Sequence, residues 1–445
     1  MGGGRTLLAI AACCLGMFAV GENSTAVMAA VPTMGRELAA SPATLTWIVN
    51  AYLLASAACI IAGGRFGDAL GAPVATIGGL VLFAAGAALI ALSGSAGLAI
   101  AGRTIQGMGA ALAVPGSLAA VRLLAPESSR STAISAWAGF LMLGFSLGPL
   151  VGGVIVHVLG WRAVFVIVAA STLVAALLLG IGSPRSSGPA PRIGTRPDLA
   201  GFVVIAAGMV GLVWALHGLA VGLLDVVVPL AVAVLAMLLL APVERRAAVP
   251  LLDLALLASP TLLVGCAVGA VAMLGIMTFL LFESLALQAT GGLSAVAAGL
   301  ALLPLSAALF ATALASPRVV AALGIRTALT LAMALVIMGM LGLMAAGASP
   351  WARGLALLAT GAGLALPYAS APRLALAALP PAKAGQASGV VSACTFLGGS
   401  AGIAAGGLAE KLAGLDGVLA MIALAAVLGI LLARMLSSAA PSPAA

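Results

Sequence analysis

Residues 132–157 read TAISAWAGFLMLGFSLGPLVGGVIVH and contain no Asp, Glu, Lys or Arg. A bilayer core about 30 Å thick is crossed by about 20 apolar residues in a helix, and this stretch is longer than that. Inside lipid the backbone N–H and C=O groups find no water, so a spanning segment must satisfy them within itself as a helix. The stretch therefore predicts a transmembrane helix.

Comparable stretches fill the chain on either side of this one. Of its 445 residues, 63% are hydrophobic and 7% are charged, whereas a soluble domain carries about 25% charged residues. We therefore expect an all-α protein embedded in the lipid bilayer of the cell membrane, with fourteen transmembrane helices. They are expected near residues 7–32, 44–63, 73–93, 96–121, 132–157, 161–182, 199–219, 223–242, 260–287, 293–315, 325–347, 351–371, 384–409 and 416–436.

The basic residues predict the orientation in the membrane. An even number of helices places both termini on one side. If that side is the cytoplasm, fourteen of the 19 Lys and Arg residues fall in cytoplasmic segments, one (Arg103) falls inside the membrane, and the other four are Arg36, Arg162, Arg353 and Lys411. Cytoplasmic loops carry an excess of Lys and Arg, so we expect cytoplasmic termini. The net charge of +8 then reflects orientation and does not indicate nucleic-acid binding.

A weak internal repeat suggests two related halves. Residues 65–71 read RFGDALG and residues 318–324 read RVVAALG, with Arg and Leu-Gly at the same spacing. Secondary transporters are commonly built from repeated halves that rock around a site at the middle of the membrane. We expect an N-terminal six-helix bundle at 1–182, a linker with two additional helices at 183–259, and a C-terminal six-helix bundle at 260–445.

Five ordered segments carry a resemblance to a known family. They are 47–54 (WIVNAYLL), 64–71 (GRFGDALG), 103–111 (RTIQGMGAA), 144–153 (GFSLGPLVGG, followed by GWR at 160–162) and 250–254 (PLLDL). Together they resemble the major facilitator superfamily, and specifically its fourteen-helix drug/proton antiporter branch. The resemblance implies the major-facilitator fold, two six-helix bundles plus two inserted helices.

The resemblance also implies a function. Proteins of this branch are antiporters that export small hydrophobic or amphipathic molecules, such as drugs and antibiotics, by alternating access. The implied partners are the small-molecule substrate and protons; no cofactor, metal or nucleic acid is expected, and the chain is expected to work as a monomer. The segment 64–71 and the residues that follow it form the loop motif, which joins two expected helices. At three positions of this motif the family normally has basic residues, where this chain has Ala69, Ala72 and Pro73.

Two of the motifs imply gating residues. In the loop motif these are Gly64, Asp68 and Gly71, with Asp68 capping a helix of the other half. In the segment 144–153, which we call the antiporter motif, they are Gly144, Gly148, Pro149, Gly152 and Gly153. Glycines at this spacing let another helix approach closely, and a proline removes a backbone hydrogen bond and can bend the helix. The alternative is ordinary small-residue packing between membrane helices.

Three charged residues are expected inside the membrane: Glu22, Arg103 and Glu283. A charge facing lipid costs several kcal/mol, so such groups face a cavity or one another. A rise of about 1.5 Å per residue places Glu22 about 15 Å and Arg103 about 10 Å below the outer ends of their helices, where they can meet, and Glu283 at about 6 Å, where water can reach it. We expect all three to take part in proton coupling, with Glu22 as the proton carrier; the alternative is a static Glu22–Arg103 pair.

Asn23 occupies the position where the family usually has Asp. Adjacent helix residues point about 100° apart, so Glu22 and Asn23 do not face the same cavity squarely. The residues expected to contact substrate are Asn23, Asn50, Tyr52, Gln106 and Tyr368. For the two tyrosines, interface anchoring or core packing is the alternative.

Other functions stay open beside drug export. One is a dedicated exporter of a single metabolite, lipid or self-resistance compound. Another, from a different class, is a membrane-embedded enzyme or a non-transporting sensor on the same fold. The sequence has no His-Glu-x-x-His, no phosphate-binding Walker loop and no Cys/His cluster at metal spacing, so we do not expect an enzyme. The five cysteines lie in apolar stretches and are expected to be free thiols.

Overall fold

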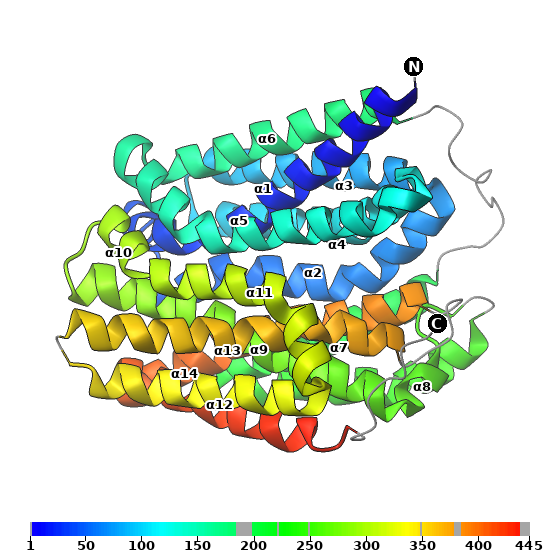
Figure 1. Ribbon diagram of the computed structural model, residues 1–445. Helices are drawn as coiled ribbons and strands as arrows, with labels where there is room; N and C mark the ends of the chain where they lie inside the picture. Colours follow the sequence, from blue (N-terminus) through cyan, green and yellow to red (C-terminus); the bar gives the residue numbers. More distant parts are fainter. Residues whose placement is uncertain are drawn as a thin grey trace.

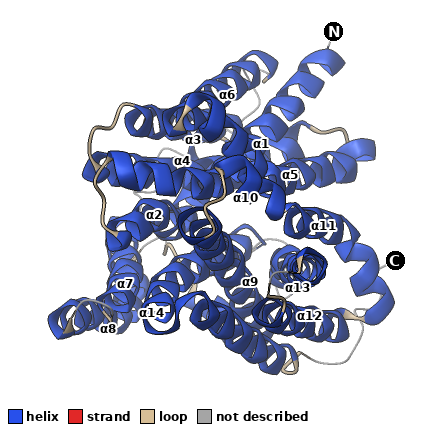
Figure 2. Cartoon of the chain, turned by 90° about the vertical axis from the view of Figure 1, so that its left-hand side faces the viewer, coloured by secondary structure: helices blue, strands red, loops and turns tan. Residues whose placement is uncertain are grey.

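The computed structural model describes residues 2–183, 198–219, 222–247, 250–347, 349–377 and 384–436. In these ranges every regular element is a helix (Figure 2). The long helices are α1 (Gly2–Glu37), α2 (Pro42–Leu70), α3 (Ala72–Ala91), α4 (Ala96–Leu124), α5 (Arg130–Leu159), α6 (Trp161–Gly182), α7 (Leu199–Gly218), α8 (Leu223–Arg246), α9 (Pro260–Leu285), α11 (Leu303–Leu323), α12 (Ile325–Ala345), α13 (Pro350–Ala377) and α14 (Ala384–Ala433). Short helical segments lie at Glu127–Ser129, Leu254–Ala258, Ala286–Thr290 and α10 (Ala295–Ala301).

The structure confirms the expected all-α membrane fold and its helix count. Thirteen helices in the described ranges are long and apolar enough to cross a membrane. The last of them, α14, contains non-helical backbone at Ala413 and Gly414, so it is two helices joined at a kink. Counting both gives the fourteen segments that the sequence predicts. α1 begins and α14 ends toward the same side of the molecule (Figure 1), as an even count requires.

Several predicted boundaries differ from the structure, and two of the differences involve a proline. The helix expected at 293–315 is divided at Leu302, because Pro304 at the start of α11 offers no N–H to continue the preceding helix. Conversely, α1 continues through Pro32 to Glu37, beyond the expected end at residue 32. Membrane helices tolerate an internal proline where neighbouring groups satisfy the freed carbonyl.

The helices form two bundles and a peripheral pair. In the first bundle α1 packs on α5 and α6, α3 packs on α4 and α6, and α2 packs on α4. In the second, α9 packs on α14 and α13, and α12 packs on α13 and α14. Helices α7 and α8 lie at the edge, where α7 contacts α2 and α14 (Figure 2). This arrangement is the expected pair of six-helix bundles with two inserted helices.

Helix α8 shows which surface faces lipid. It packs mainly on α7 and leaves large apolar side chains exposed along its length; among them are Leu223, Leu224, Val227, Val228, Leu235, Met237 and Leu238. In water such a surface would be unfavourable, but lipid tails are as apolar as leucine. The inserted pair therefore presents its outer face to the bilayer.

Candidate functional site

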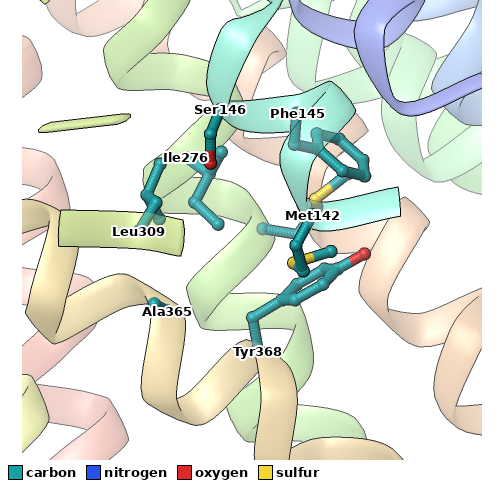
Figure 3. Close-up of a pocket in the computed structure, with 8 residues that line it drawn as sticks. Met142, Phe145, Ser146, Ile276, Leu309, Ala365 and Tyr368 are labelled. Carbon is teal, nitrogen blue, oxygen red and sulfur yellow. The ribbon is translucent and has the colours of Figure 1, made fainter. Parts of the chain in front are cut away.

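A small closed cavity lies between the two bundles. Its volume is about 20 Å³, and α5, α9, α11 and α13 supply its lining, which is Met142, Phe145, Ser146, Met273, Ile276, Leu309, Ala365 and Tyr368 (Figure 3). A cavity needs roughly 10–15 Å³ to hold one water molecule, whereas small-molecule sites measure about 300–1,000 Å³. The cavity must therefore widen before it can hold a ligand.

The walls of this cavity are apolar and adaptable. Tyr368 of α13 and Phe145 of α5 meet edge to face, with ring centroids 6.1 Å apart, and Met142 lies beside them (Figure 3). Methionine side chains are flexible and polarizable, so they adjust to ligands of irregular shape. Of the five residues expected to contact substrate, Tyr368 lines the cavity. The other four are not among its lining residues.

A polar cluster inside the first bundle contains three of those four residues, Asn23, Tyr52 and Gln106, together with Arg103. Arg103 is fully buried; its Nε donates to the Ile48 carbonyl oxygen (3.1 Å) and its Nη1 to Oε1 of Gln106 (3.0 Å). Gln106 Nε2 in turn donates to Oδ1 of Asn23 (3.3 Å). The Arg103 guanidinium also lies 4.5 Å from the centroid of the Tyr52 ring. The cluster therefore links α4 to α1 and α2.

Tyr52 connects this cluster to the second bundle. Its hydroxyl is hydrogen-bonded to Ser24 (3.1 Å), and its ring packs edge-on against Phe396 of α14, with centroids 6.4 Å apart. Asn50, two residues earlier, is fully buried, and neither its Oδ1 nor its Nδ2 has a hydrogen-bond partner among the residues that the structure describes. Both side chains are therefore packed inside the closed structure.

The Glu22–Arg103 ion pair, the alternative to a proton-carrier role for Glu22, is absent among the described side chains. Within the described ranges the ion pairs are Arg162–Glu37 and Arg353–Glu283. Asn23 is the α1 residue whose side chain reaches α4, and its neighbour Glu22 points elsewhere because adjacent helix positions differ by about 100°. Glu22 is 5% exposed, and its Oε1 has no hydrogen-bond partner.

The expectation that Glu283 is hydrated is wrong. Its carboxylate is 2% exposed and forms an ion pair with Arg353. Sequence analysis places Arg353 on the outer side, near the start of the helix expected at 351–371, and in the structure it lies in the first turn of α13, which begins at Pro350. From there its long side chain reaches α9. Glu283 is therefore held by a partner, unlike Glu22.

The antiporter-motif glycines face two different neighbours. A β-carbon at Gly144, Gly148 or Gly152 would collide with α1, at the backbone of Phe18, Glu22 and Ala26. One at Gly153 would instead collide with the Ala295 carbonyl oxygen of α10, in the other bundle. On the same side, Gly299 of α10 lies against Pro149.

A hydrogen bond joins the bundles at the same end. Ser284 of α9 donates from Oγ to the Met28 carbonyl oxygen of α1 (3.2 Å), and Gln288 Nε2 donates to Ser284 Oγ (2.9 Å). Together with the Gly153–Ala295 contact, this bond closes the space between the bundles at the end where α1 and α9 finish.

The loop motif is described only in part. Gly71 ends α2 and precedes α3 with φ of 87°, a conformation that L residues rarely adopt. Gly64 lies within α2, with open space where a β-carbon would point. The side chain of Asp68 lies outside the described part of the structure, so its gating role stays a prediction.

Comparison with known proteins identifies the family. Residues 13–403 match the family described as Major Facilitator Superfamily. The chain belongs to this superfamily. It is therefore a multi-pass membrane transporter of small molecules and not an enzyme, as the motifs predict.

The relatives in this superfamily include proteins named for export or efflux. The chain is 32% identical, over 90% of its length and 74% of the relative's, to the "Tetracenomycin C resistance and export protein" of Streptomyces glaucescens. It is 31% identical, over 67% of its length and 60% of the relative's, to the "Multidrug efflux pump LfrA" of Mycolicibacterium smegmatis. A partially occluded, inward-open structure of the xylose transporter XylE from E. coli matches with a TM-score of 0.68 and 16% identity, covering 97% of this chain and 98% of that one. That likeness shows the superfamily fold.

Sequence reasoning missed most of the cavity lining in this superfamily member. Met142, Phe145 and Met273 are apolar residues in apolar helices, so no chemical signal separates them from lipid-facing neighbours. Position offers a signal for two residues of the lining, since Phe145 and Ser146 lie inside the 144–153 motif. The structure brings Tyr368 together with these residues, while it places Asn23, Tyr52, Arg103 and Gln106 in a separate cluster.

Proposed function

We propose that this transporter is a proton-coupled antiporter that exports small hydrophobic or amphipathic molecules, including drugs and antibiotics, by alternating access. The observation that carries the proposal is the apolar cavity between the two bundles, lined by Met142, Phe145 and Tyr368. Apolar walls select ligands by shape and hydrophobicity more than by specific polar groups. The relatives named for multidrug efflux and for antibiotic export support the same substrate class.

Alternating access requires the closed end to open. In the cycle we propose, the Ser284–Met28 hydrogen bond and the Gly153–Ala295 contact separate while the two bundles rock around the cavity. Both contacts are small and local, and a rocking equilibrium shifts by only as much as substrate and proton binding differ between its states.

Glu22 is the proton carrier in this proposal, and Arg103 and Glu283 are coupling residues. Glu22 is a buried acid with no ion pair in the described structure, whereas Glu283 is held by Arg353. In general, a carboxyl group holds its proton more readily in apolar surroundings than in contact with water. Opening and closing of the bundles would therefore load and unload the proton.

Substrate-induced proton release from proteoliposomes tests the carrier assignment. Glu22→Gln should abolish the release while leaving the protein folded. Glu127→Gln, which changes an exposed acid in the turn before α5, is the matched control and should behave like the unchanged chain. Unaltered proton release from the Glu22→Gln variant would overturn the assignment.

A dedicated exporter of a single compound is the second candidate. The relative named for export of tetracenomycin C supports it. A panel of dyes and antibiotics separates the two candidates, because a multidrug exporter lowers the accumulation of several and a dedicated one of a single class. A transporter should move its substrate against a concentration gradient, and a protonophore should stop this transport. A non-transporting sensor would show no such transport.

The topology in the cell completes the proposal. We place the protein in the plasma membrane as a monomer with cytoplasmic termini, and we divide it into 1–182, 183–259 and 260–445. The excess of Lys and Arg on one side supports the orientation. Protease treatment of intact cells tests it, since tags at both termini should stay protected.

A further inference from the structure

Two cysteine side chains meet on the outer wall of the second bundle. Cys266 of α9 and Cys394 of α14 line one groove of about 390 Å³, together with Leu212 of α7. Their side chains lie close enough to interact with one another. The proton-transport proposal uses neither residue.

Close helix packing brings the two thiols together. Helices α9 and α14 run in the same direction, and a β-carbon at Gly398 would collide with Ala270, while one at Gly269 would lie 2.5 Å from Oγ1 of Thr395. Small residues therefore let the backbones approach at the level of Cys266 and Cys394. The two cysteines therefore lie on different helices beside this contact and line the same groove.

The groove is reached from the bilayer. Leu212 and Leu263 on its walls are 38% and 46% exposed, and both belong to membrane-spanning helices. The remaining lining is Ala267, Ala270, Leu397, Gly398 and Ala401. A molecule that binds here must therefore be soluble in lipid and must find its specific interactions at the two sulfur atoms.

The two thiol groups limit the chemical class of the ligand further. Zinc takes four ligands in structural sites, and the described residues contain no group of three or more His, Cys, Asp or Glu able to hold a metal. Two sulfur ligands suit a soft centre. Thiols in apolar surroundings tend to keep their protons, so a metal cation would have to expel two protons into hydrocarbon. A neutral thiophile that removes the protons itself avoids this cost.

We propose that Cys266 and Cys394 form a dithiol site for lipophilic trivalent arsenicals that enter from the bilayer. An arsenoxide, R–As=O, forms two As–S bonds with the two thiols. The arsenic–oxygen bond breaks, and the two thiol protons leave with the oxygen as water, so arsenic stays trivalent. The product joins α9 to α14 covalently.

Phenylarsine oxide and the full-length protein in lipid nanodiscs test the site. We expect one arsenical per chain and the loss of two of the five free thiols, reversed by 2,3-dimercaptopropanol but not by a monothiol. A phenylarsine oxide carrying a charged ring substituent should react at least ten times more slowly, because it does not enter the bilayer. Retention of all five thiols in the unchanged chain would overturn the proposal.

The other cysteines supply matched controls. Cys266→Ala and Cys394→Ala should each lose the dithiol-reversible adduct, whereas the double change of the neighbouring pair Cys13 and Cys14 to Ala should keep it. A bridged adduct that persists in Cys266→Ala, or that disappears from the Cys13/Cys14 variant, would assign the arsenical to another pair and refute the site.

Discussion

A β-carbon placed at Gly144 would lie 2.7 Å from the backbone nitrogen of Glu22. The antiporter motif of α5 is therefore packed directly on the stretch of α1 that carries the proposed proton carrier. Any shift of α5 along α1 moves the backbone of Glu22. The motif glycines thus connect helix packing with the position of the acid.

Gly144→Val should disrupt this contact. The added side chain collides with backbone atoms of Phe18 and Glu22, which cannot rotate away, and overpacking costs about 1–3 kcal/mol or more. We expect a lower thermal unfolding midpoint in detergent and loss of transport. Gly139→Val in the same helix is the control, because open space surrounds that position. Equal effects of the two substitutions would show that the close approach is unimportant.

Gly153→Val should instead act on the contact between bundles. Its new side chain meets Ala295 of α10, so we expect the closed end to open and the opposite end to close. Ser284→Cys reports the change, because residue 284 lies buried at that end. A membrane-impermeant maleimide should label it several times faster when Gly153→Val is present. An unchanged labelling rate would contradict this role.

Asn23→Asp should stabilise the polar cluster. A carboxylate at this position would accept a hydrogen bond from Gln106, which itself accepts one from Arg103. The Nη2 of Arg103 has no hydrogen-bond partner among the described residues. Hydrogen bonds to charged groups contribute about 1.5–3 kcal/mol. We expect a higher unfolding midpoint, and because the stabilising form is the charged one, the gain should fall as the pH is lowered.

Asn50→Asp provides the opposite case. Asn50 is equally buried but has no hydrogen-bond partner in the closed structure, and an unpaired buried charge is strongly unfavourable. This substitution should lower the midpoint. If both variants shift the unfolding midpoint in the same direction, the polar cluster does not specifically stabilise a carboxylate at position 23.

The Glu283–Arg353 pair should show strong coupling. Removing one partner of a fully buried pair costs roughly 3–5 kcal/mol, and less is expected here because the Arg353 side chain is 32% exposed. Glu283→Gln and Arg353→Gln should each lower stability, and the double variant should lose less than the sum of the two. Purely additive losses in the double-mutant cycle would show that the pair contributes no coupling energy.

Much of the fold can be predicted from the sequence, because its cause is local. Each apolar stretch is long enough to cross the bilayer, and inside the bilayer such a segment must form a helix to satisfy its backbone hydrogen bonds. The division at Leu302 was missed because Pro304 lies in an otherwise continuous apolar run, and proline is tolerated in membrane helices according to its neighbours. Pro32 and Pro304 have opposite outcomes in this chain, and the sequence alone does not distinguish them.

The site is harder to predict because it depends on helix rotation. Glu22 and Asn23 are adjacent, and which of them faces Arg103 is decided by how α1 packs on α5 through the motif glycines. The partner of Glu283 depends on how α13 lies beside α9, which brings Arg353 to its carboxylate. A charge count identifies the residues that cannot face lipid, but it does not pair them.

Tyr368→Ala should weaken the binding of flat aromatic substrates. The substitution removes one ring of the Phe145–Tyr368 pair in the cavity, and an aromatic pair contributes about 0.5–1.5 kcal/mol beyond the area it buries. That corresponds to an increase in Kd of about 2- to 12-fold, since each 1.4 kcal/mol changes the constant tenfold. Fluorescent substrate titration in detergent measures it. Tyr368→Phe keeps the ring and should bind as the unchanged chain does, because the hydroxyl is not the recognised group. If Tyr368→Ala binds with unaltered affinity, the cavity between the bundles is not where aromatic substrates are held.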